Sequence, residues 1–326
     1  MIHILILMLS LIPLPDEAFY PQVPSARGVA MGGAIVALPD YATPALYNPA
    51  MLNFLEHPYI AIGFSSKKTT IDGLQEASSL SGRGITFLGF ATYQGALFWA
   101  PLFNAHYTRE DTSEVYSRFN EFGISLTSLT GQEQKLTPDR HFLMGANIKY
   151  FYGLIAYANP QKSEAWITSG HGAGLDVGVT FHYSPIILSI AGRNLLSRVW
   201  WKNGDKSTFP ITGRIGASFK ARTFLFAGEI EFNNDPLNPI YHIGTEWSGV
   251  HIGEDQVRIP LQLGVEVKDE NLIVSAGITM QYSHQILLNL AFWSDSLPTS
   301  TVHTRVTLHI VLAEEEEDVY EAPILE

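Results

Sequence analysis

Motifs that could support catalysis or bind a metal are few in this sequence. The chain has eleven histidines, but none lies in the His-Glu-x-x-His spacing that holds zinc on a helix. Ser65-Ser66-Lys67-Lys68 fits the pattern Ser-x-x-Lys, but the companion motifs of the enzymes that use it are missing. Gly170–Gly174 is glycine-rich, yet it opens a predicted strand instead of a helix, so no phosphate cradle follows. Because no nucleophile can be paired with a base, we predict no enzyme, no metal and no cofactor.

Charged side chains recur on one face of several segments in which apolar and polar residues alternate. In that position they can form ion pairs with one another. Both signs are present, and opposite charges across a narrow bore would pair and close it rather than leave a wide water channel. An ordinary solvated interior is the alternative to a specific ion pathway. The predicted luminal charges are Asp176, Arg193, Arg214, Lys220, Glu229, Glu231, Glu246, Glu266, Lys268 and Arg305.

The segment Ser25–Leu55 is the long part of the N-terminal half that least resembles a strand. Its glycines allow tight bends and close packing, and Asn48 before Pro49 is pushed away from helix into a turn. We predict a compact plug in which Arg27 could pair with a carboxylate of the surrounding wall. The alternative is that the residues only shape the plug and do not gate it. The predicted hatch residues are Arg27, Gly28, Met31, Gly32, Gly33, Asp40, Asn48, Pro49 and Ala50.

The composition indicates that much of the surface does not face water. Hydrophobic residues make up 46% and charged residues only 16%, against a usual charged share of about a quarter. No run of about 18 apolar residues follows the N-terminus, so a closed β-barrel is the remaining way to cross a membrane. The absence of cysteine excludes disulfides and thiolate sites, and the net charge of −12 argues against a nucleic-acid partner.

The two ends of the chain differ from its body. Ile2–Leu14 is apolar but too short to span a bilayer, which is typical of a secretory signal peptide over residues 1–18, although no Lys or Arg precedes it. A buried first strand is the alternative. Residues 313–326 are rich in Glu, and a block of like charges repels itself, so we predict a disordered tail. That tail is either simply solvated or docks a basic periplasmic partner.

Segments after Leu55 alternate between apolar and polar residues, as in a barrel wall with one face toward lipid and one toward the lumen. In Gly172–Tyr183, for example, Val177 and Val179 point one way and Asp176 and Thr180 the other. Fourteen such segments are predicted near 57–66, 83–92, 95–107, 114–129, 138–152, 170–183, 185–194, 208–220, 223–232, 239–248, 257–268, 270–281, 284–293 and 301–312. The predicted fold is therefore all-β: a transmembrane antiparallel up-and-down β-barrel of about 14 strands with an N-terminal luminal hatch or plug.

The predicted connections alternate between tight links and longer polar loops. Tyr93–Gly95 and Ser184-Pro185 are tight, whereas Asn159–Gly170 and Leu196–Phe209 are predicted loops. Short turns on one rim and long loops on the other are typical of outer-membrane barrels. A soluble β-sandwich or propeller would also alternate, but it does not account for so many long strands with so little surface charge.

Two stretches carry a resemblance to a known family. ARGVAMGGAIVALPDYATPALYNPAML, from Ala26, resembles the N-terminal segment of the FadL-type outer-membrane transporters, and it is most similar to their PorV/PorQ-like branch. GLDVGVTFHYSPIILSIAGRNL (Gly174–Leu195) is similar to that branch as well. The resemblance implies a fourteen-stranded barrel with a luminal hatch. Such barrels usually end on an aromatic residue, whereas here Leu312 is followed by the acidic tail.

From the pattern and the resemblance we expect a signal peptide (1–18), a hatch (19–55), a transmembrane barrel (56–312) and the tail (313–326), in the outer membrane of a diderm bacterium. The expected function is passage or binding of hydrophobic small molecules, long-chain fatty-acid-like, gated by the hatch. One alternative is a partner-binding barrel in type IX protein secretion, and another is a structural barrel without transport. The expected partners are outer-membrane lipid and either a hydrophobic ligand or secretion-system proteins.

Overall fold

The computed structural model describes residues 25–69, 80–108, 113–128, 141–233, 237–252, 257–268, 271–282, 285–294 and 302–312. The predicted signal peptide (1–18) and acidic tail (313–326) lie outside these residues. Among the described residues, no helix is both long and apolar enough to cross a membrane.

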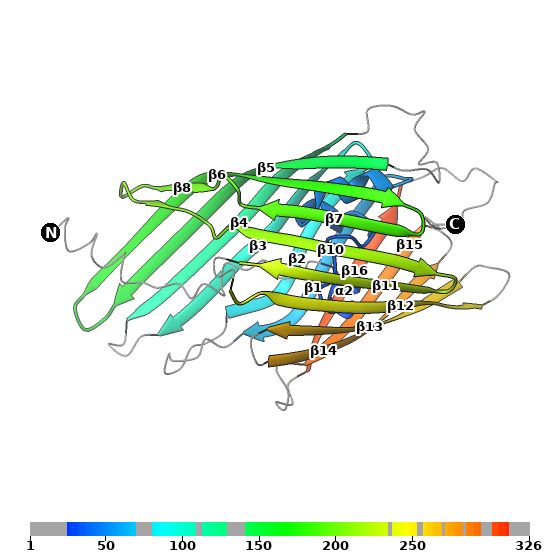
Figure 1. The fold of residues 1–326 in the computed structure, drawn as a ribbon. Helices are drawn as coiled ribbons and strands as arrows, with labels where there is room; N and C mark the ends of the chain where they lie inside the picture. Colours follow the sequence, from blue (N-terminus) through cyan, green and yellow to red (C-terminus); the bar gives the residue numbers. More distant parts are fainter. Residues whose placement is uncertain are drawn as a thin grey trace.

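Fourteen strands form a closed antiparallel ring in which each strand pairs with its neighbours along the chain (Figure 1). The ring closes because β1 pairs with β16 and β5 pairs with β6. Its strands are β1 (Tyr59–Thr69), β2 (Leu80–Thr92), β3 (Gly95–Thr108), β4 (Glu114–Thr127), β5 (His141–Asn159), β6 (Glu164–Tyr183), β7 (Ile186–Arg193), β10 (Thr212–Ala221), β11 (Phe224–Phe232), β12 (Ile240–Ile252), β13 (Val257–Lys268), β14 (Asn271–Tyr282), β15 (Ile286–Ser294) and β16 (Val302–Val311). The predicted fold class, an up-and-down barrel of 14 strands, is confirmed.

Period-two alternation decides which face of the wall is buried. In β6, Asp176, Thr180 and His182 are buried inside the barrel, while Phe181 and Tyr183 are exposed on the outside. The outward residues of the other strands are also largely apolar, for example Ile148 at 62% and Ile243 at 65% exposure. An apolar belt of this extent would be costly in water on a soluble protein. It is favourable where the outer face of the barrel contacts lipid.

The two ends of the barrel are unlike each other. At the terminal end, where β1 begins and β16 ends, β2 and β3 and likewise β6 and β7 are joined by two-residue turns. At the opposite end, called here the hairpin end, β5 and β6 extend to 19 and 20 residues and meet at a tight turn (Figure 1). The prediction of a long loop over 159–170 is therefore wrong. Asn159 pairs with Glu164, and Tyr157 stacks on Trp166 with ring centroids 5.3 Å apart, so paired strands continue to the turn.

The predicted loop over 196–209 also contains regular structure. Strand β8 (Arg198–Trp201) pairs with β6 beyond the point where β7 ends, and β9 (Lys206–Ser207) pairs with β8. Asn194 takes a left-handed conformation (φ 56°) at the break between β7 and β8. The loop thus folds back onto the wall instead of extending freely into solvent.

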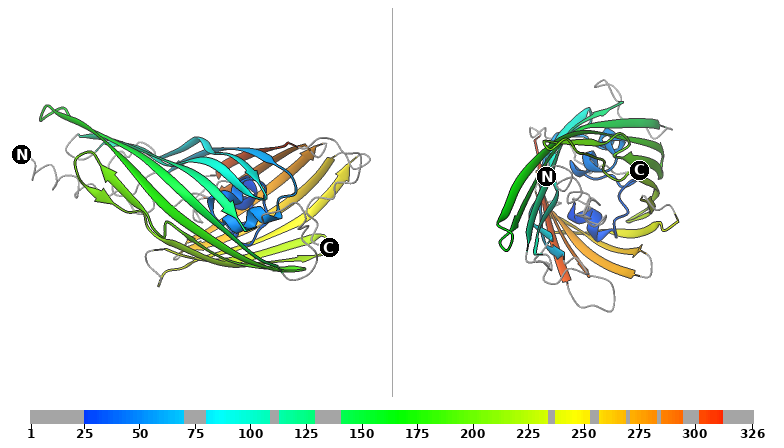
Figure 2. Two further views of the ribbon diagram at one scale, coloured as in Figure 1. Left: turned by 90° about the horizontal axis from the view of Figure 1, so that it is seen from above. Right: turned by 90° about the vertical axis from the view of Figure 1, so that its left-hand side faces the viewer.

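Residues 25–55, called here the inner segment, lie within the ring of strands (Figure 2). The segment contains α2 (Ala26–Ala30), η2 (Thr43–Leu46) and η3 (Pro49–Phe54). Ser25 caps α2 by accepting the Gly28 amide at 2.8 Å, and Asn48 caps η3 by accepting the Ala50 amide at 3.1 Å. Most of its side chains are buried, and the Ala26 amide donates to Thr307 Oγ1 of β16 at 2.8 Å. Residues 25–55 thus pack against the inner face of the wall strands, while their role as a hatch and as a gate stays a prediction.

Candidate functional site

The first contact of the inner segment is with a row of wall glycines on β10 and β12–β14. A Cβ added to Gly264 would lie 1.9 Å from the Gly32 amide nitrogen, and one added to Gly244 would lie 2.4 Å from the Met31 carbonyl oxygen. Gly32 itself has a φ of 67°, which favours glycine. The two backbones therefore touch directly, and any side chain at Gly244 or Gly264 would push the segment away.

A second seat lies on the opposite wall, on β5 and β6. A Cβ on Gly178 would lie 2.0 Å from Asn48 Oδ1, and one on Gly145 would meet the backbone of Pro49 at 2.4 Å. Asn48 Nδ2 donates to the Val36 carbonyl at 2.6 Å, which ties the two parts of the segment together. The predicted hatch residues Gly32, Asn48, Pro49 and Ala50 thus lie at these contacts.

Charged groups on the wall bind the backbone of the segment. We call Arg214, Glu229, Glu231 and His242 the anchoring cluster. Glu229 Oε2 accepts the amides of Ile35 and Val36, both at 2.7 Å, and Glu229 Oε1 accepts Arg214 Nη1 at 2.5 Å. The carbonyl of Gly32 lies 2.8 Å from His242 Nδ1. The cluster therefore supplies acceptors and donors to inner-segment groups that would otherwise be buried without partners.

Three members of the anchoring cluster have ligand atoms spaced as for a metal ion. One ligand atom each from Glu229, Glu231 and His242 lies within 4.8 Å of the others. Both carboxylates, however, are ion-paired with Arg214, and Glu229 also holds two amides. A cation would have to displace these bonds, so the donor set does not fit a metal centre and fits anchoring of the segment.

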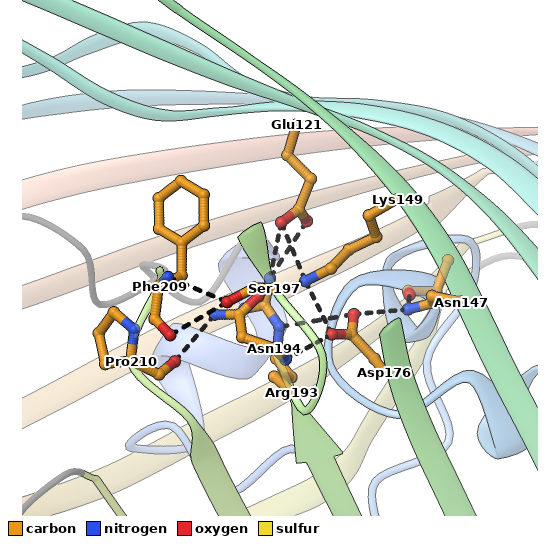
Figure 3. A network of polar contacts seen from close by, with 10 residues as sticks. Glu121, Asn147, Lys149, Asp176, Arg193, Asn194, Ser197, Phe209 and Pro210 are labelled. Atoms are coloured by element: carbon orange, nitrogen blue, oxygen red, sulfur yellow. Dashed lines mark hydrogen bonds and ion pairs between the residues drawn. The ribbon is translucent and has the colours of Figure 1, made fainter. Parts of the chain in front are cut away.

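A second ionic group lies within the wall itself, midway along β4–β7 (Figure 3). We call Glu121, Lys149, Asp176 and Arg193 the wall network. Lys149 Nζ lies 2.7 Å from Asp176 and 3.2 Å from Glu121, and Arg193 lies 3.1 Å from Glu121. Two cations meet two carboxylates, so the group is neutral in spite of its burial. Asp176 and Arg193 were predicted as luminal charges, and here they pair along one side of the wall, whereas pairing across the bore stays a prediction.

Aromatic and aliphatic side chains fill the interior between the wall network and the hairpin end. This aromatic cluster consists of Val115, Phe119, Phe151, Ile155, Tyr157, Val199 and Phe209, with Leu102, Trp166 and Trp201 packed against it. Phe151 and Phe209 have ring centroids 4.5 Å apart, and Phe119 meets Trp201 edge-on at 5.4 Å. Val199, Trp201 and Phe209 come from the loop after β7, which therefore covers this apolar interior from the side.

Arg27 ties α2 both to the wall and to the bend at Pro39. Its Nε lies 2.6 Å and its Nη2 3.0 Å from the two carboxylate oxygens of Glu246, and its Nη1 donates to the Pro39 carbonyl. Burial opposes its charge, but Glu246 and Asp40 raise the pKa of Arg27 well above its ordinary value. Burial likewise opposes the charge of Asp40, yet His309 and Arg27 hold the pKa of that carboxyl below its ordinary value. Both groups are therefore charged at neutral pH.

A cavity of about 110 Å³ lies at the terminal end, between the inner segment and strands β10–β14. Its polar lining includes Arg27, Glu246, Lys220 and Arg258, and Arg258 Nε donates to the Ser248 carbonyl at 3.0 Å. Its apolar lining comes from both the segment and the wall, with Tyr41, Phe54, Leu55, Tyr59, Phe224 and Leu225. The Arg27–Glu246 pair thus separates this cavity from the seat of the segment.

The structure brings the predicted charges together in groups rather than in one site. Of the predicted luminal charges, Asp176 and Arg193 belong to the wall network, and Arg214, Glu229 and Glu231 to the anchoring cluster. Glu246 pairs with Arg27, Lys220 lines the cavity, and Glu266 lies 3.7 Å from His242. Arg305 is buried over the ring of Trp293, and Lys268 ends β13 half-buried. Gly28 and Met31 are buried in and just after α2.

Sequence reasoning missed Glu121, Lys149 and His242. The positions of Glu121 and Lys149 follow the same alternation as Phe119 and Phe151, which are apolar and face inward. The signal was a charged residue on the inward-facing side of a strand, because such a residue must find a partner.

Comparison with solved structures places the fold. The CymD monoaromatic hydrocarbon channel matches with a TM-score of 0.59 at 11% identity, over 90% of this chain and 97% of that one. The Pseudomonas putida toluene transporter TodX matches with a TM-score of 0.58 at 12% identity, over 90% of this chain and 100% of that one. No protein-family model and no curated protein matches the sequence.

The chain therefore has the fold of a closed antiparallel β-barrel like those of CymD and TodX. Identities of 11% and 12% establish the fold alone. Membership of the FadL-type transporters and of their PorV/PorQ-like branch stays a prediction.

Proposed function

We propose that this protein is an outer-membrane barrel of a diderm bacterium that lets hydrophobic small molecules pass, with the inner segment as its gate. One observation carries the proposal: the interior of the closed ring holds an aromatic cluster at the hairpin end and a docked segment below it. A molecule entering from the hairpin end meets aromatic rings instead of an aqueous bore, and aromatic-lined interiors favour apolar ligands. CymD, a monoaromatic hydrocarbon channel, and TodX, a toluene transporter, have a similar fold, which supports this proposal.

The backbone of β2 and β3 supports a path through the wall as well. Their pairing is regular from Leu88 to Thr92 on β2, but between Leu80 and Leu88 the register shifts and the ladder is interrupted. Pro101 of β3, which has no amide proton to donate, lies in the facing stretch. An interrupted ladder is a weak place in a barrel, where an apolar molecule can leave for the lipid.

The gate can be tested by cross-linking the segment to the wall, because the chain has no cysteine of its own. A Cβ on Gly216 would lie 2.6 Å from Val36 Cγ1, so the two Cβ atoms are close enough for a disulfide. The double variant Val36→Cys/Gly216→Cys is expressed in diderm cells that lack their own hydrocarbon transporter, and uptake of labelled toluene is measured. We expect uptake when the pair is reduced and loss of uptake when it is oxidised.

The two single-cysteine variants serve as matched controls under the same oxidant. Equal uptake by the reduced and oxidised pair would rule out gating by the segment. If the wild type takes up no more toluene than cells with an empty vector, passage itself is excluded and a structural barrel remains.

The secretion alternative is decided by what co-purifies with the barrel in mild detergent. Stoichiometric periplasmic or exported proteins, without a bound apolar molecule, would favour a partner-binding barrel of the type IX kind. A stoichiometric fatty acid, alkane or aromatic compound would favour passage.

A further inference from the structure

The cavity at the terminal end is lined by charges whose signs do not balance. Arg27, Lys220 and Arg258 are basic, whereas Asp40 and Glu246 are acidic, so three positive charges face two negative ones. Glu246 is bound by Arg27 through two hydrogen bonds, and Asp40 accepts from Thr43 at 2.5 Å. Arg27 and Thr43 of the inner segment thus engage Glu246 and Asp40, and Arg258 lies across the cavity from the segment, on β13.

Arg258 is the side chain best placed to bind an anion in this cavity. Its Nε donates to the Ser248 carbonyl at 3.0 Å, which holds the side chain along the wall. That bond uses one of the five donors of a guanidinium, and the two terminal amino groups carry the other four. A carboxylate is the acceptor that matches such a planar fork, since it takes two parallel bonds.

The rest of the lining is apolar and rich in rings. Tyr41 and Tyr59 have ring centroids 5.2 Å apart, and Phe54, Leu55 and Phe224 complete this side of the cavity. The volume of about 110 Å³ compares with the cavity of about 150 Å³ that holds a benzene ring in a well-studied engineered core. The space is smaller than that reference cavity, so it limits the ligand to at most one ring or a short chain and is too small for a long acyl chain.

We propose that this cavity binds a small carboxylic acid with one aromatic ring or a short alkyl chain, with its carboxylate on Arg258 and its apolar part against Tyr41, Tyr59 and Phe224. The inference rests on the proposed function. It names the class of ligand that would bind at the terminal end of the barrel, where the proposed path for small molecules ends. An uncharged hydrocarbon would desolvate the basic groups without offering them an acceptor, which is unfavourable. An acid offers that acceptor, so this end of the barrel selects acids over hydrocarbons of the same size.

The test uses two probes that differ only in the carboxylate, 4-fluorobenzoate and 4-fluorotoluene. Each is titrated into the full-length barrel in a neutral detergent, and binding is followed by fluorine NMR. We expect the wild type to bind 4-fluorobenzoate more tightly than 4-fluorotoluene. Arg258→Gln should weaken 4-fluorobenzoate by about tenfold or more, the loss of a charge-assisted bond, and leave 4-fluorotoluene unchanged. Arg258→Lys should restore part of the affinity.

The matched control is Arg198→Gln, because Arg198 is exposed on β8 at the other end of the barrel. Equal weakening by Arg198→Gln and Arg258→Gln would overturn the proposal, as would tighter binding of 4-fluorotoluene to the wild type. The position of the bound ligand is tested with the variant Thr223→Cys, because Thr223 lines the cavity. The rate at which a thiol reagent labels this cysteine is measured with and without ligand. 4-Fluorobenzoate should slow this labelling, and no protection would place the ligand elsewhere. Toluene uptake by the cells described above is unaffected by either result, so failure of this site is distinguishable from failure of transport.

Discussion

The wall network and the anchoring cluster contain the same kinds of side chain but join different parts of the molecule. In the wall network, Lys149 and Arg193 connect carboxylates of neighbouring wall strands. In the anchoring cluster, Glu229 uses one oxygen for Arg214 of the wall and the other for two backbone amides of the inner segment. The first group holds strands to strands, whereas the second holds the inner segment to the wall.

The difference also appears in charge balance. The wall network has two cations for two carboxylates, and the asparagines Asn147 and Asn194 donate further bonds to Asp176 at 3.1 and 2.8 Å. The anchoring cluster has one arginine for two carboxylates, so the amides of the segment and the ring of His242 complete it. The hydrogen bonds of the anchoring cluster are complete only when the inner segment is in place, so the cluster favours the docked segment. Its four residues belong to the wall strands and can remain folded when the segment is undocked.

The largest effect is expected from Lys149→Met, which leaves Glu121 and Asp176 facing each other with only Arg193 between them. Breaking a buried ion pair by removing one partner typically costs about 3–5 kcal/mol, because a buried charge loses its compensation. Urea unfolding of the barrel in lipid vesicles should show this loss for Lys149→Met. Lys202→Met, at an exposed lysine, is the control and should change stability by no more than about 0.5 kcal/mol. A wild-type unfolding curve for Lys149→Met would mean that the wall network adds nothing to stability.

A smaller and different effect is expected from Glu229→Gln, which keeps the shape but removes the charge that the two amides contact. Hydrogen bonds to a charged group contribute about 1.5–3 kcal/mol, so undocking of the segment should become about 10- to 150-fold more frequent. The labelling rate of Ala34→Cys, which is buried in the segment, measures undocking directly. Urea unfolding of the barrel should change less than for Lys149→Met, because Arg214 keeps Glu231 as a partner when Glu229 loses its charge. A variant that loses barrel stability without faster labelling would remove the distinction between the two ionic groups.

The smallest effect is expected from Asn48→Ala, at the second seat. Loss of its cap on η3 should cost about 1 kcal/mol, or roughly a fivefold faster labelling of Ala45→Cys. Ala34→Cys, in the part of the segment held by Glu229, should label at nearly its original rate. Equal acceleration at both cysteines would show that the inner segment opens as one unit and that its two seats are not independent.

The barrel could be predicted from sequence because its wall has one apolar face and one polar face. The resulting alternation of apolar and polar residues can be recognised within each strand separately. Val177 and Val179 against Asp176 and Thr180 set the face and register of β6 without knowledge of its partners. The extension of β5 and β6 could not be predicted in this way. Beyond the membrane the outer face of a strand meets water, so the polar residues near Glu164 look the same in a strand as in a loop.

The candidate site was predictable only in part. Arg27 and Asn48 stand out in a segment with no strand pattern, and the structure places both at contacts with the wall. Gly264 and Gly178 do not stand out, because their role depends on which backbone faces them across the barrel. Glu121 and Lys149 were missed because their inward neighbours, Phe119 and Phe151, are apolar, and the expected polar interior does not hold there.

The hydrogen bond from the Ala26 amide to Thr307 joins residues 281 positions apart in the chain. Synthesis makes the inner segment before any of the strands that bind it, and β16 is the last strand to be made. Contacts between such distant residues form late, since the intervening chain must first be ordered. The segment therefore has to remain undocked, with its amides solvated, until these strands have paired. The earliest residues of the folded structure to be synthesised are thus among the last to reach their native positions.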